Sequence, residues 1–133
     1  MKIAKYSTAT LMTLILATAA IADAGAAPTA LSEGVYTAEQ AAAGQATFER
    51  NCSTCHNADY YKTVFQQWRG QPVQYLFEQV MSAMPADKPG ALLDNEYEDV
   101  FAYVLQILGF PGGDTRLEYA NGMMREIPIE PAS

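Results

Sequence analysis

The chain has 133 residues, half of them hydrophobic, with 8 basic and 15 acidic side chains and a formal net charge of −7. Its length indicates a single domain, and its acidic balance excludes a nucleic-acid-binding protein, which needs clustered lysines and arginines. An acidic chain of this size is either simply soluble or steered toward partner proteins with a positive docking patch.

The first 24 residues have the pattern of a secretory signal peptide. Lys2 and Lys5 precede a short apolar run over residues 11–22, LMTLILATAAIA, and a small-x-small cleavage pattern ends at Ala24. The alternative is an uncleaved anchor helix, but the run is short for a membrane span. We therefore expect export, cleavage near Ala24, no stable membrane span afterwards, and a mature chain with a net charge of −8.

Residues 25–36 are rich in alanine, glycine and proline, which predicts a flexible leader. Thr37 follows as a helix cap, and Gln40 is placed to complete a capping box. Small and apolar residues then recur at helical spacing. We expect a first helix from about Ala38 to Asn51, which ends directly at the first of two cysteines.

Residues 57–70 show a mixed pattern and predict a loop with at most a short helical piece. A second helix is expected after Pro72, because proline is favoured in the first turn. It should end near Ala83, because Pro85 disfavours helical backbone at the residue before it.

Asp94 is expected to cap a third helix, whose apolar stripe from Tyr97 to Leu108 fits the 3.6-residue period. Gly109 should end this helix, and the Pro-Gly-Gly sequence at 111–113 should prevent a restart. Residues 114–133 then predict a C-terminal tail that finishes as an extended strap. No strand or internal repeat is predicted, so the class is all-α.

The most specific motif is Cys52-Ser53-Thr54-Cys55-His56. C-x-x-C-H is the attachment signature of c-type haem, in which two thiols add to the vinyl groups of one porphyrin and the histidine binds the iron. Three alternatives are weaker. A disulfide would close a very small loop, a zinc site would need ligands that no other cysteine or histidine supplies, and a thioredoxin-like pair would follow a strand in a βαβ setting.

His56 is the only histidine in the chain, which excludes bis-histidine ligation, so the sixth ligand must be a methionine, a lysine, another weak donor or nothing. We predict Met84, because Pro85 forces it into an extended backbone from which its thioether can reach the iron. The alternative for Met84 is core packing. Met81 lies one helical turn earlier and is expected in the core, and the other two mature methionines lie in the tail.

Together these features resemble the bacterial class I cytochromes c with one haem. They are most similar to the small c-type cytochromes associated with periplasmic quinoprotein alcohol dehydrogenases. The resemblance covers residues 37–113 and includes Gly44-x-x-x-Phe48, C-x-x-C-H, FQQWRG at 65–70, SAMPADKPG at 82–90, and the segment from 97 onward. It implies a cytochrome c fold with three main helices around one covalent haem, and a periplasmic location.

The resemblance also implies roles for single residues. Cys52 and Cys55 would attach one haem c, and His56 and Met84 would be the axial ligands of its iron. Trp68 would pack near the haem, where its indole N–H could reach a propionate, or would belong to the plain core.

Two further expectations concern the packing around this site. Gly44 would let the first helix cross closely over the last, beside Phe48 and Tyr103, and Tyr103 itself is expected in the core. After His56 the chain reads NADYYKTV and departs from the family, which has a glycine and a proline-containing loop whose carbonyl holds the imidazole. Either the haem is exposed on that side, or Tyr60 and Tyr61 cover it.

The function expected from these features is electron transfer, and not catalysis on a substrate. Its partners would be redox proteins, with a quinoprotein dehydrogenase as donor and an oxidase or another cytochrome as acceptor. Two alternatives stay open. One is a haem enzyme or gas sensor with an open sixth site, and the other is a haem-bearing subunit of a dehydrogenase complex that docks through the tail.

Overall fold

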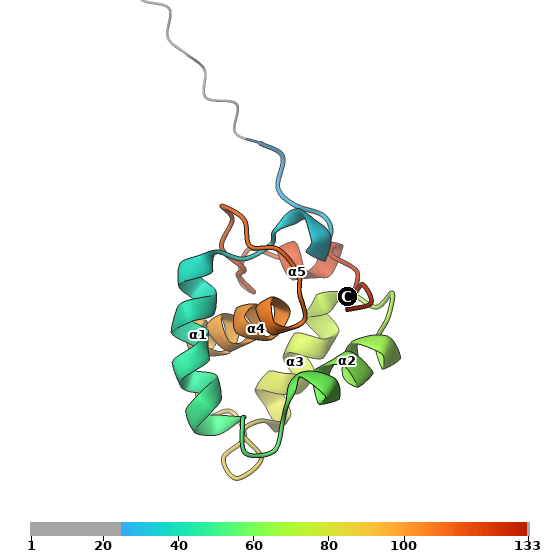
Figure 1. Cartoon of the computed structure of the whole chain (residues 1–133). Coiled ribbons are helices and arrows are strands. Elements are labelled where there is room, and N and C mark those ends of the chain that lie inside the picture. Colours follow the sequence, from blue (N-terminus) through green and yellow to red (C-terminus); the bar gives the residue numbers. More distant parts are fainter. Residues whose placement is uncertain (1–24, 133) are drawn as a thin grey trace, which may run out of the picture.

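The computed structural model describes residues 25–132, so the expected signal peptide and its cleavage site lie outside the described residues. Within them the chain folds into α-helices joined by loops (Figure 1). The elements are a 3-10 turn η1 (Leu31–Glu33), α1 (Ala38–Asn51), α2 (Ala58–Gln67), α3 (Val73–Ala83), α4 (Asp94–Ile107) and α5 (Met123–Glu126). Residues 25–132 contain no strand beyond one isolated antiparallel bridge, so the all-α class is confirmed.

The crossing of α1 over α4 organises the fold, and α2 and α3 also contact α4 (Figure 1). Helix α1 begins where predicted, because the Thr37 hydroxyl accepts a hydrogen bond from the amide of Gln40 at 3.1 Å. At the crossing a Cβ on Gly44 would lie 1.8 Å from the carbonyl oxygen of Asp99, so only glycine fits there. Beside it, Phe48 meets Tyr103 edge to face, with ring centroids 5.2 Å apart. The predicted close crossing is confirmed.

The capping box expected at Gln40 is not formed. The Gln40 amide is fully buried and pairs with the backbone of Leu117 instead: its Nε2 donates to the carbonyl at 2.8 Å, and its Oε1 accepts from the amide at 2.9 Å. Buried backbone groups need partners, and Gln40 supplies both for Leu117. The groups that Gln40 pairs with therefore belong to the tail, 77 residues further along the sequence.

The expectation of a loop over residues 57–70 is also corrected, because most of this segment forms helix α2. The Asn57 side chain caps this helix by accepting from the amide of Tyr60 at 2.9 Å. Of its residues only Phe65 is fully buried. The apolar stripe is therefore narrow, which explains why the periodicity was weak.

Helix α3 begins directly after Pro72 and ends at Ala83, as predicted. Helix α4 differs by one residue from the expectation, because Asp94 is its first helical residue and not its cap. The cap is instead made by Glu96, whose carboxylate accepts from the amide of Leu93 at 2.9 Å. Gly109, with a φ of 86°, follows the end of the helix as expected.

Leu31, Val35 and Tyr36 pack into the core, so the flexible leader predicted for residues 25–36 is wrong over this part of it. Leu31 and Val35 are completely buried, and the hydroxyl of buried Tyr36 donates to the carbonyl of Phe110 at 2.7 Å. At Tyr36 the prediction failed because its partner Phe110 lies 74 residues away in the sequence.

The tail is part of the same core. It contains the short helix α5, and the side chains of Leu117, Met124, Ile127 and Ile129 are buried. The expected extended strap is present at its end, where residues 127–129 run beside residues 70–73. Hydrogen bonds from Gly70 to Ile129 (2.9 Å), from Val73 to Ile127 (2.9 Å) and from Ile129 to Gln71 (2.8 Å) join the two segments.

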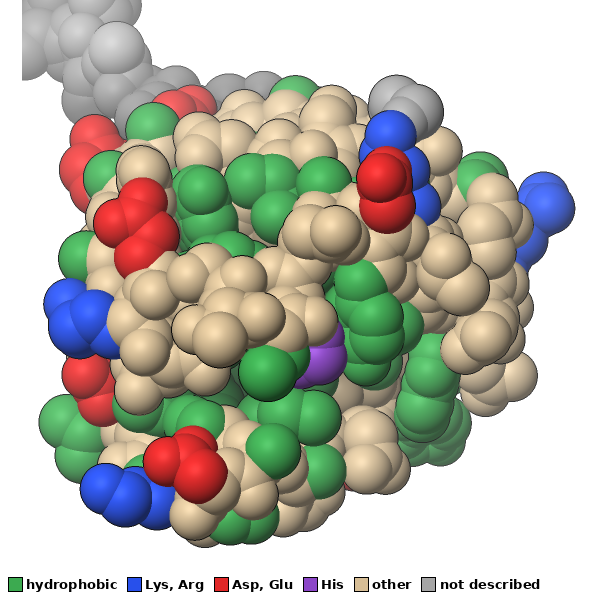
Figure 2. Space-filling view, turned by 60° about the horizontal axis from the view of Figure 1, so that its bottom comes forward, with side chains coloured by type: hydrophobic (Ala, Val, Ile, Leu, Met, Phe, Trp, Pro, Cys, Tyr) green, Lys and Arg blue, Asp and Glu red, His purple; other side chains and the backbone are tan. Residues whose placement is uncertain are grey.

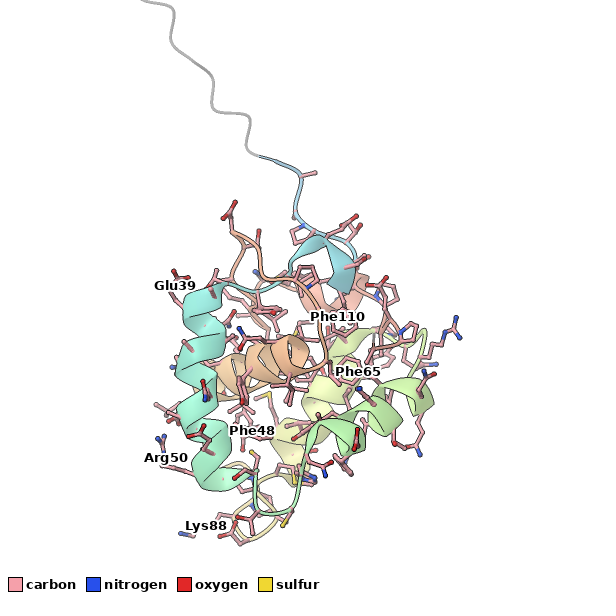
Figure 3. The ribbon with its side chains drawn as sticks, in the orientation of Figure 1. Glu39, Phe48, Arg50, Phe65, Lys88 and Phe110 are labelled. Atoms are coloured by element: carbon pink, nitrogen blue, oxygen red, sulfur yellow. The ribbon has the colours of Figure 1, made fainter. Side chains whose placement is uncertain are left out.

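One hydrophobic cluster connects these elements. Phe48, Phe65 and Phe110 point inward between the helices, whereas Glu39, Arg50 and Lys88 point outward (Figure 3). Within residues 25–132, no helix combines the length and the apolar character that a bilayer crossing requires.

Candidate functional site

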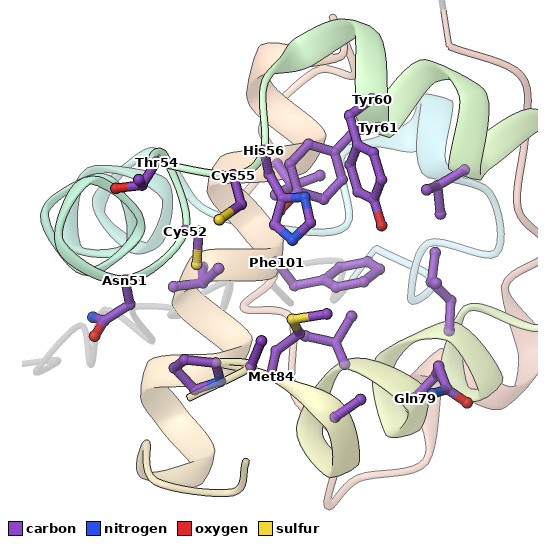
Figure 4. Close-up of a pocket in the computed structure, with 18 of the residues that line it drawn as sticks. Asn51, Cys52, Thr54, Cys55, His56, Tyr60, Tyr61, Gln79, Met84 and Phe101 are labelled. Carbon is purple, nitrogen blue, oxygen red and sulfur yellow. The ribbon is translucent and has the colours of Figure 1, made fainter. Parts of the chain in front are cut away.

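A pocket of about 600 Å³ lies at the end of the molecule where α1 runs into the C-x-x-C-H motif. Its walls come from the end of α1, the motif itself, α2, α3 with the loop that follows it, and the middle of α4 (Figure 4). On this face the purple imidazole of His56, the only histidine, lies recessed beside hydrophobic side chains (Figure 2). The pocket has the size of a small-molecule or cofactor site.

The backbone of the motif is a tight turn built on the last turn of α1. The amide of Cys52 donates to Phe48 at 2.8 Å, and the amides of Cys55 and His56 both donate to the carbonyl of Cys52, at 3.1 and 2.9 Å. The turn places both thiols and the imidazole on one wall of the pocket. Cys52 is half-buried, Cys55 is exposed, and both sulfurs are free. Burial raises the pKa of the Cys52 thiol.

The imidazole of His56 lies against the two tyrosines that follow it. Tyr60 stacks on it with ring centroids 4.2 Å apart and an interplanar angle of 27°, and Tyr61 is tilted against it at 5.7 Å. Tyr60 and Tyr61 thus lie against the imidazole on this side of the site, although the Tyr60 side chain is itself 43% exposed. Burial raises the pKa of Tyr61 well above its usual value, which keeps the phenol neutral.

The two nitrogens of His56 have different surroundings. Nδ1 is buried and has no hydrogen-bond partner among the described residues, so no backbone carbonyl orients the ring as the resemblance would imply. One ring nitrogen points into the pocket toward Met84 (Figure 4). Burial lowers the pKa of His56, which favours the neutral imidazole, the form that binds a metal.

Met84 lies across the pocket from His56 (Figure 4). It follows the last residue of α3 with an extended backbone, φ −121° and ψ 154°, as expected for a residue before Pro85. Its carbonyl accepts a hydrogen bond of 2.6 Å from the hydroxyl of Tyr97 and one of 3.3 Å from the amide of Gly90. The two predicted axial ligands are thus brought to one pocket from different elements.

The other site predictions have mixed outcomes. Trp68 lines the pocket and also packs against the core, so both of its expected roles remain compatible with its position. Met81 packs against the core as expected. Sequence analysis did not assign the pocket wall formed by Val100, Phe101 and Val104, although the period of the third helix had placed them on its apolar stripe.

The chemistry of the pocket suits a large apolar group with a metal at its centre. Most of its lining is hydrophobic, and Arg50 and Asp87 are its charged members apart from the ionisable Cys, His and Tyr side chains. Among the described residues, no three His, Cys, Asp or Glu side chains converge as a site for a bare metal ion. Two thiols, one imidazole and one thioether around an apolar cavity are the donor set of a c-type haem, and the residues present fit that group.

Residues 39–104 match a family model described as cytochrome c oxidase, cbb3-type, subunit III. The match covers about half of the chain and includes all but the first residue of α1, the C-x-x-C-H motif, Met84 and most of α4. These residues form a cytochrome c domain. No curated protein and no solved structure matches the chain. The cytochrome c domain supports a covalent haem and electron transfer.

Proposed function

We propose that this chain is an exported carrier of single electrons, with one haem held by Cys52 and Cys55 and bound axially by His56 and Met84. The observation that carries the proposal is the meeting of the C-x-x-C-H turn and Met84 in one apolar pocket. The haem would supply an iron that alternates between the ferric and ferrous states. The side chains of the cytochrome domain would hold the haem and form its surroundings.

The protein can favour the ferrous state through two of its features. A thioether ligand opposite an imidazole raises the potential of haem iron, and Met84 is placed to be that ligand. The apolar lining acts in the same direction, because a low-dielectric surrounding makes the additional positive charge of the ferric form costly. We therefore expect a reduction potential well above that of a variant without the thioether.

Fixed ligands also suit rapid electron transfer. His56 is held by the turn on Cys52 and by Tyr60 and Tyr61, and Met84 is held through its carbonyl. Neither side chain needs to move when the charge of the site changes. In this proposal the one histidine of the pocket would be bound to the iron, so it would not act as an acid or base on a substrate.

The partners of the carrier are proposed from the resemblance and from the family match. A quinoprotein dehydrogenase is proposed as electron donor, and an oxidase or another cytochrome as acceptor, in the periplasm. The description of the matching family as an oxidase subunit supports an oxidase on the acceptor side. The exposed edge beside Cys55 is the proposed point of electron exit.

The alternative of a dehydrogenase subunit that docks through its tail receives no support from the tail itself. Leu117, Met124, Ile127 and Ile129 are used inside the fold, so these side chains are not free to bind another subunit. The alternative of an enzyme or gas sensor requires that Met84 leaves the sixth site open. The position of Met84 across from His56 supports ligation (Figure 4).

The deciding experiment compares the wild type with Met84→Ala, both produced with haem-attachment machinery. The wild type should retain haem in a denatured mass measurement, show a Met-to-iron charge-transfer band in its ferric spectrum, and bind cyanide weakly. Met84→Ala should keep the haem, lose the band, bind cyanide tightly and have a lower potential. Met81→Ala is the matched control, because Met81 packs on the core one helical turn away, and it should keep the band.

The outcomes separate the parts of the proposal. A denatured mass without haem would overturn the cytochrome assignment. A Met84→Ala spectrum identical to that of the wild type would remove Met84 as ligand and favour an open sixth site.

A further inference from the structure

The carbonyl oxygen of Met84 is the fixed point of the loop that presents this side chain. It accepts from the hydroxyl of Tyr97 at 2.6 Å and from the amide of Gly90 at 3.3 Å. The Gly90 contact closes the loop on itself, and Gly90 adopts a φ of 74° to make it. The Tyr97 contact is different, because it ties the loop to another element of the fold.

Tyr97 is well suited to hold a neighbour in place. It lies in the first turn of α4 and is 3% exposed, so its ring is locked by packing. Two residues further along the same helix, the backbone of Asp99 approaches Gly44 of α1 so closely that a Cβ at Gly44 would not fit. The position of the Tyr97 hydroxyl is therefore fixed by the rigid crossing of α1 and α4, and it does not depend on the loop that the hydroxyl holds.

We propose that Tyr97 is a positioning residue for Met84: its hydroxyl fixes the backbone at Met84 so that the thioether points into the pocket opposite His56. The inference deepens the proposed function and rests on Met84 being an axial ligand. Without the hydroxyl, the Met84 carbonyl keeps only the longer contact from Gly90, and the loop stays tied to α3 through the Met84 amide, which donates to Val80 at 2.9 Å. Met84 would then leave the iron more often, and an external ligand could take its place more easily.

The test must separate this role from the loss of any buried hydrogen bond. Tyr36 offers the matched control, because its buried hydroxyl also donates to a backbone carbonyl, that of Phe110 at 2.7 Å, and Tyr36 is not among the residues that line the pocket. Tyr103→Phe is a second control, because Tyr103 lies on the same helix as Tyr97 and outside the pocket lining.

The experiment measures cyanide affinity of the ferric haem protein, the Met-to-iron band and the reduction potential in Tyr97→Phe, Tyr36→Phe, Tyr103→Phe and the wild type, with thermal unfolding alongside. In Tyr97→Phe the cyanide affinity should rise roughly threefold to tenfold, the factor that corresponds to one net hydrogen bond. The band should weaken and the potential should fall. Tyr36→Phe should lose similar thermal stability while its cyanide affinity, band and potential stay at wild-type values.

The proposal is overturned if Tyr97→Phe loses stability like Tyr36→Phe but binds cyanide within twofold of the wild type. A second variant, Gly90→Ala, removes the other support of the same carbonyl by straining a left-handed backbone in open space, and it should move the cyanide affinity in the same direction. If the spectrum and cyanide affinity of Met84→Ala equal those of the wild type, the proposed ligation by Met84 has failed. Because that result comes from a different variant, it is distinguishable from a failure of the Tyr97 proposal.

Discussion

Replacement of Gly44 by alanine should strongly destabilise the protein, although alanine is the better helix former. Gly44 lies inside α1, where intrinsic propensity alone would favour alanine by about 1 kcal/mol. The added Cβ would, however, lie 1.8 Å from the carbonyl oxygen and 2.3 Å from the carbonyl carbon of Asp99. These neighbours are helix backbone and not the end of a flexible side chain, so α1 and α4 would have to separate.

The loss of stability in Gly44→Ala follows from how far the added Cβ must move away from the backbone of Asp99. Ordinary contact begins at 3.4 Å, so the Cβ is placed far inside it. Insertion of one methyl group into a packed core usually costs about 1–3 kcal/mol, and a clash against backbone lies at the upper end or beyond. We expect Gly44→Ala to lower the free energy of unfolding by about 3 kcal/mol or more, with a weakened Phe48–Tyr103 contact.

The assay is urea unfolding of the haem protein, followed by circular dichroism. Ala43→Gly is the matched control, because Ala43 is exposed on the same helix and should lose only about 1 kcal/mol of helix propensity. A Gly44→Ala protein as stable as the wild type, or more stable, would refute the close crossing on which this reasoning rests.

Two further predictions concern the polar contacts that hold the tail. Gln40→Leu should lower the free energy of unfolding by about 2–4 kcal/mol, because it leaves the buried amide and carbonyl of Leu117 without partners. The control Gln45→Leu, at an exposed position, should change the free energy of unfolding by less than about 0.5 kcal/mol. Equal effects of the two substitutions would contradict this account. The hydrogen bond from the Tyr119 hydroxyl, aided by Gln74, holds the pKa of Glu78 below its ordinary value of 4.5, so its contribution to stability is present above pH 4.5 and is lost as the pH falls through the lowered pKa. In Tyr119→Phe the pKa of Glu78 should rise toward its ordinary value in an NMR titration, and an unchanged titration would show that this bond is not formed in solution.

The elements that could be predicted from the sequence are those whose signals are local. The cap at Thr37 and the helical period gave α1 at its true bounds, and the proline after Met84 gave both the end of α3 and the extended backbone. Helix α2 was missed because its one fully buried residue, Phe65, leaves almost no period to detect. Local patterns suffice only where a helix buries a broad face.

The remaining misses depend on contacts between distant residues. Tyr36 and Phe110 are 74 residues apart, and Gln40 and Leu117 are 77 apart, so nothing near either residue indicates burial. The site shows the same division. The adjacent Cys55 and His56 indicate a haem site from the sequence alone. The hydroxyl of Tyr97, in contrast, reaches Met84 only because of how α4 is placed in the fold.

The seam between the strap and the start of α3 bears on how this haem module could be moved into another protein. The family match ends at residue 104, and the recognisable motifs end at residue 113. An excised unit cut at either point would leave the amides of Gly70 and Val73 without acceptors and expose the side of the core that Ile127 and Ile129 cover. The portable unit for fusion or grafting therefore extends from Leu31 to at least Ile129.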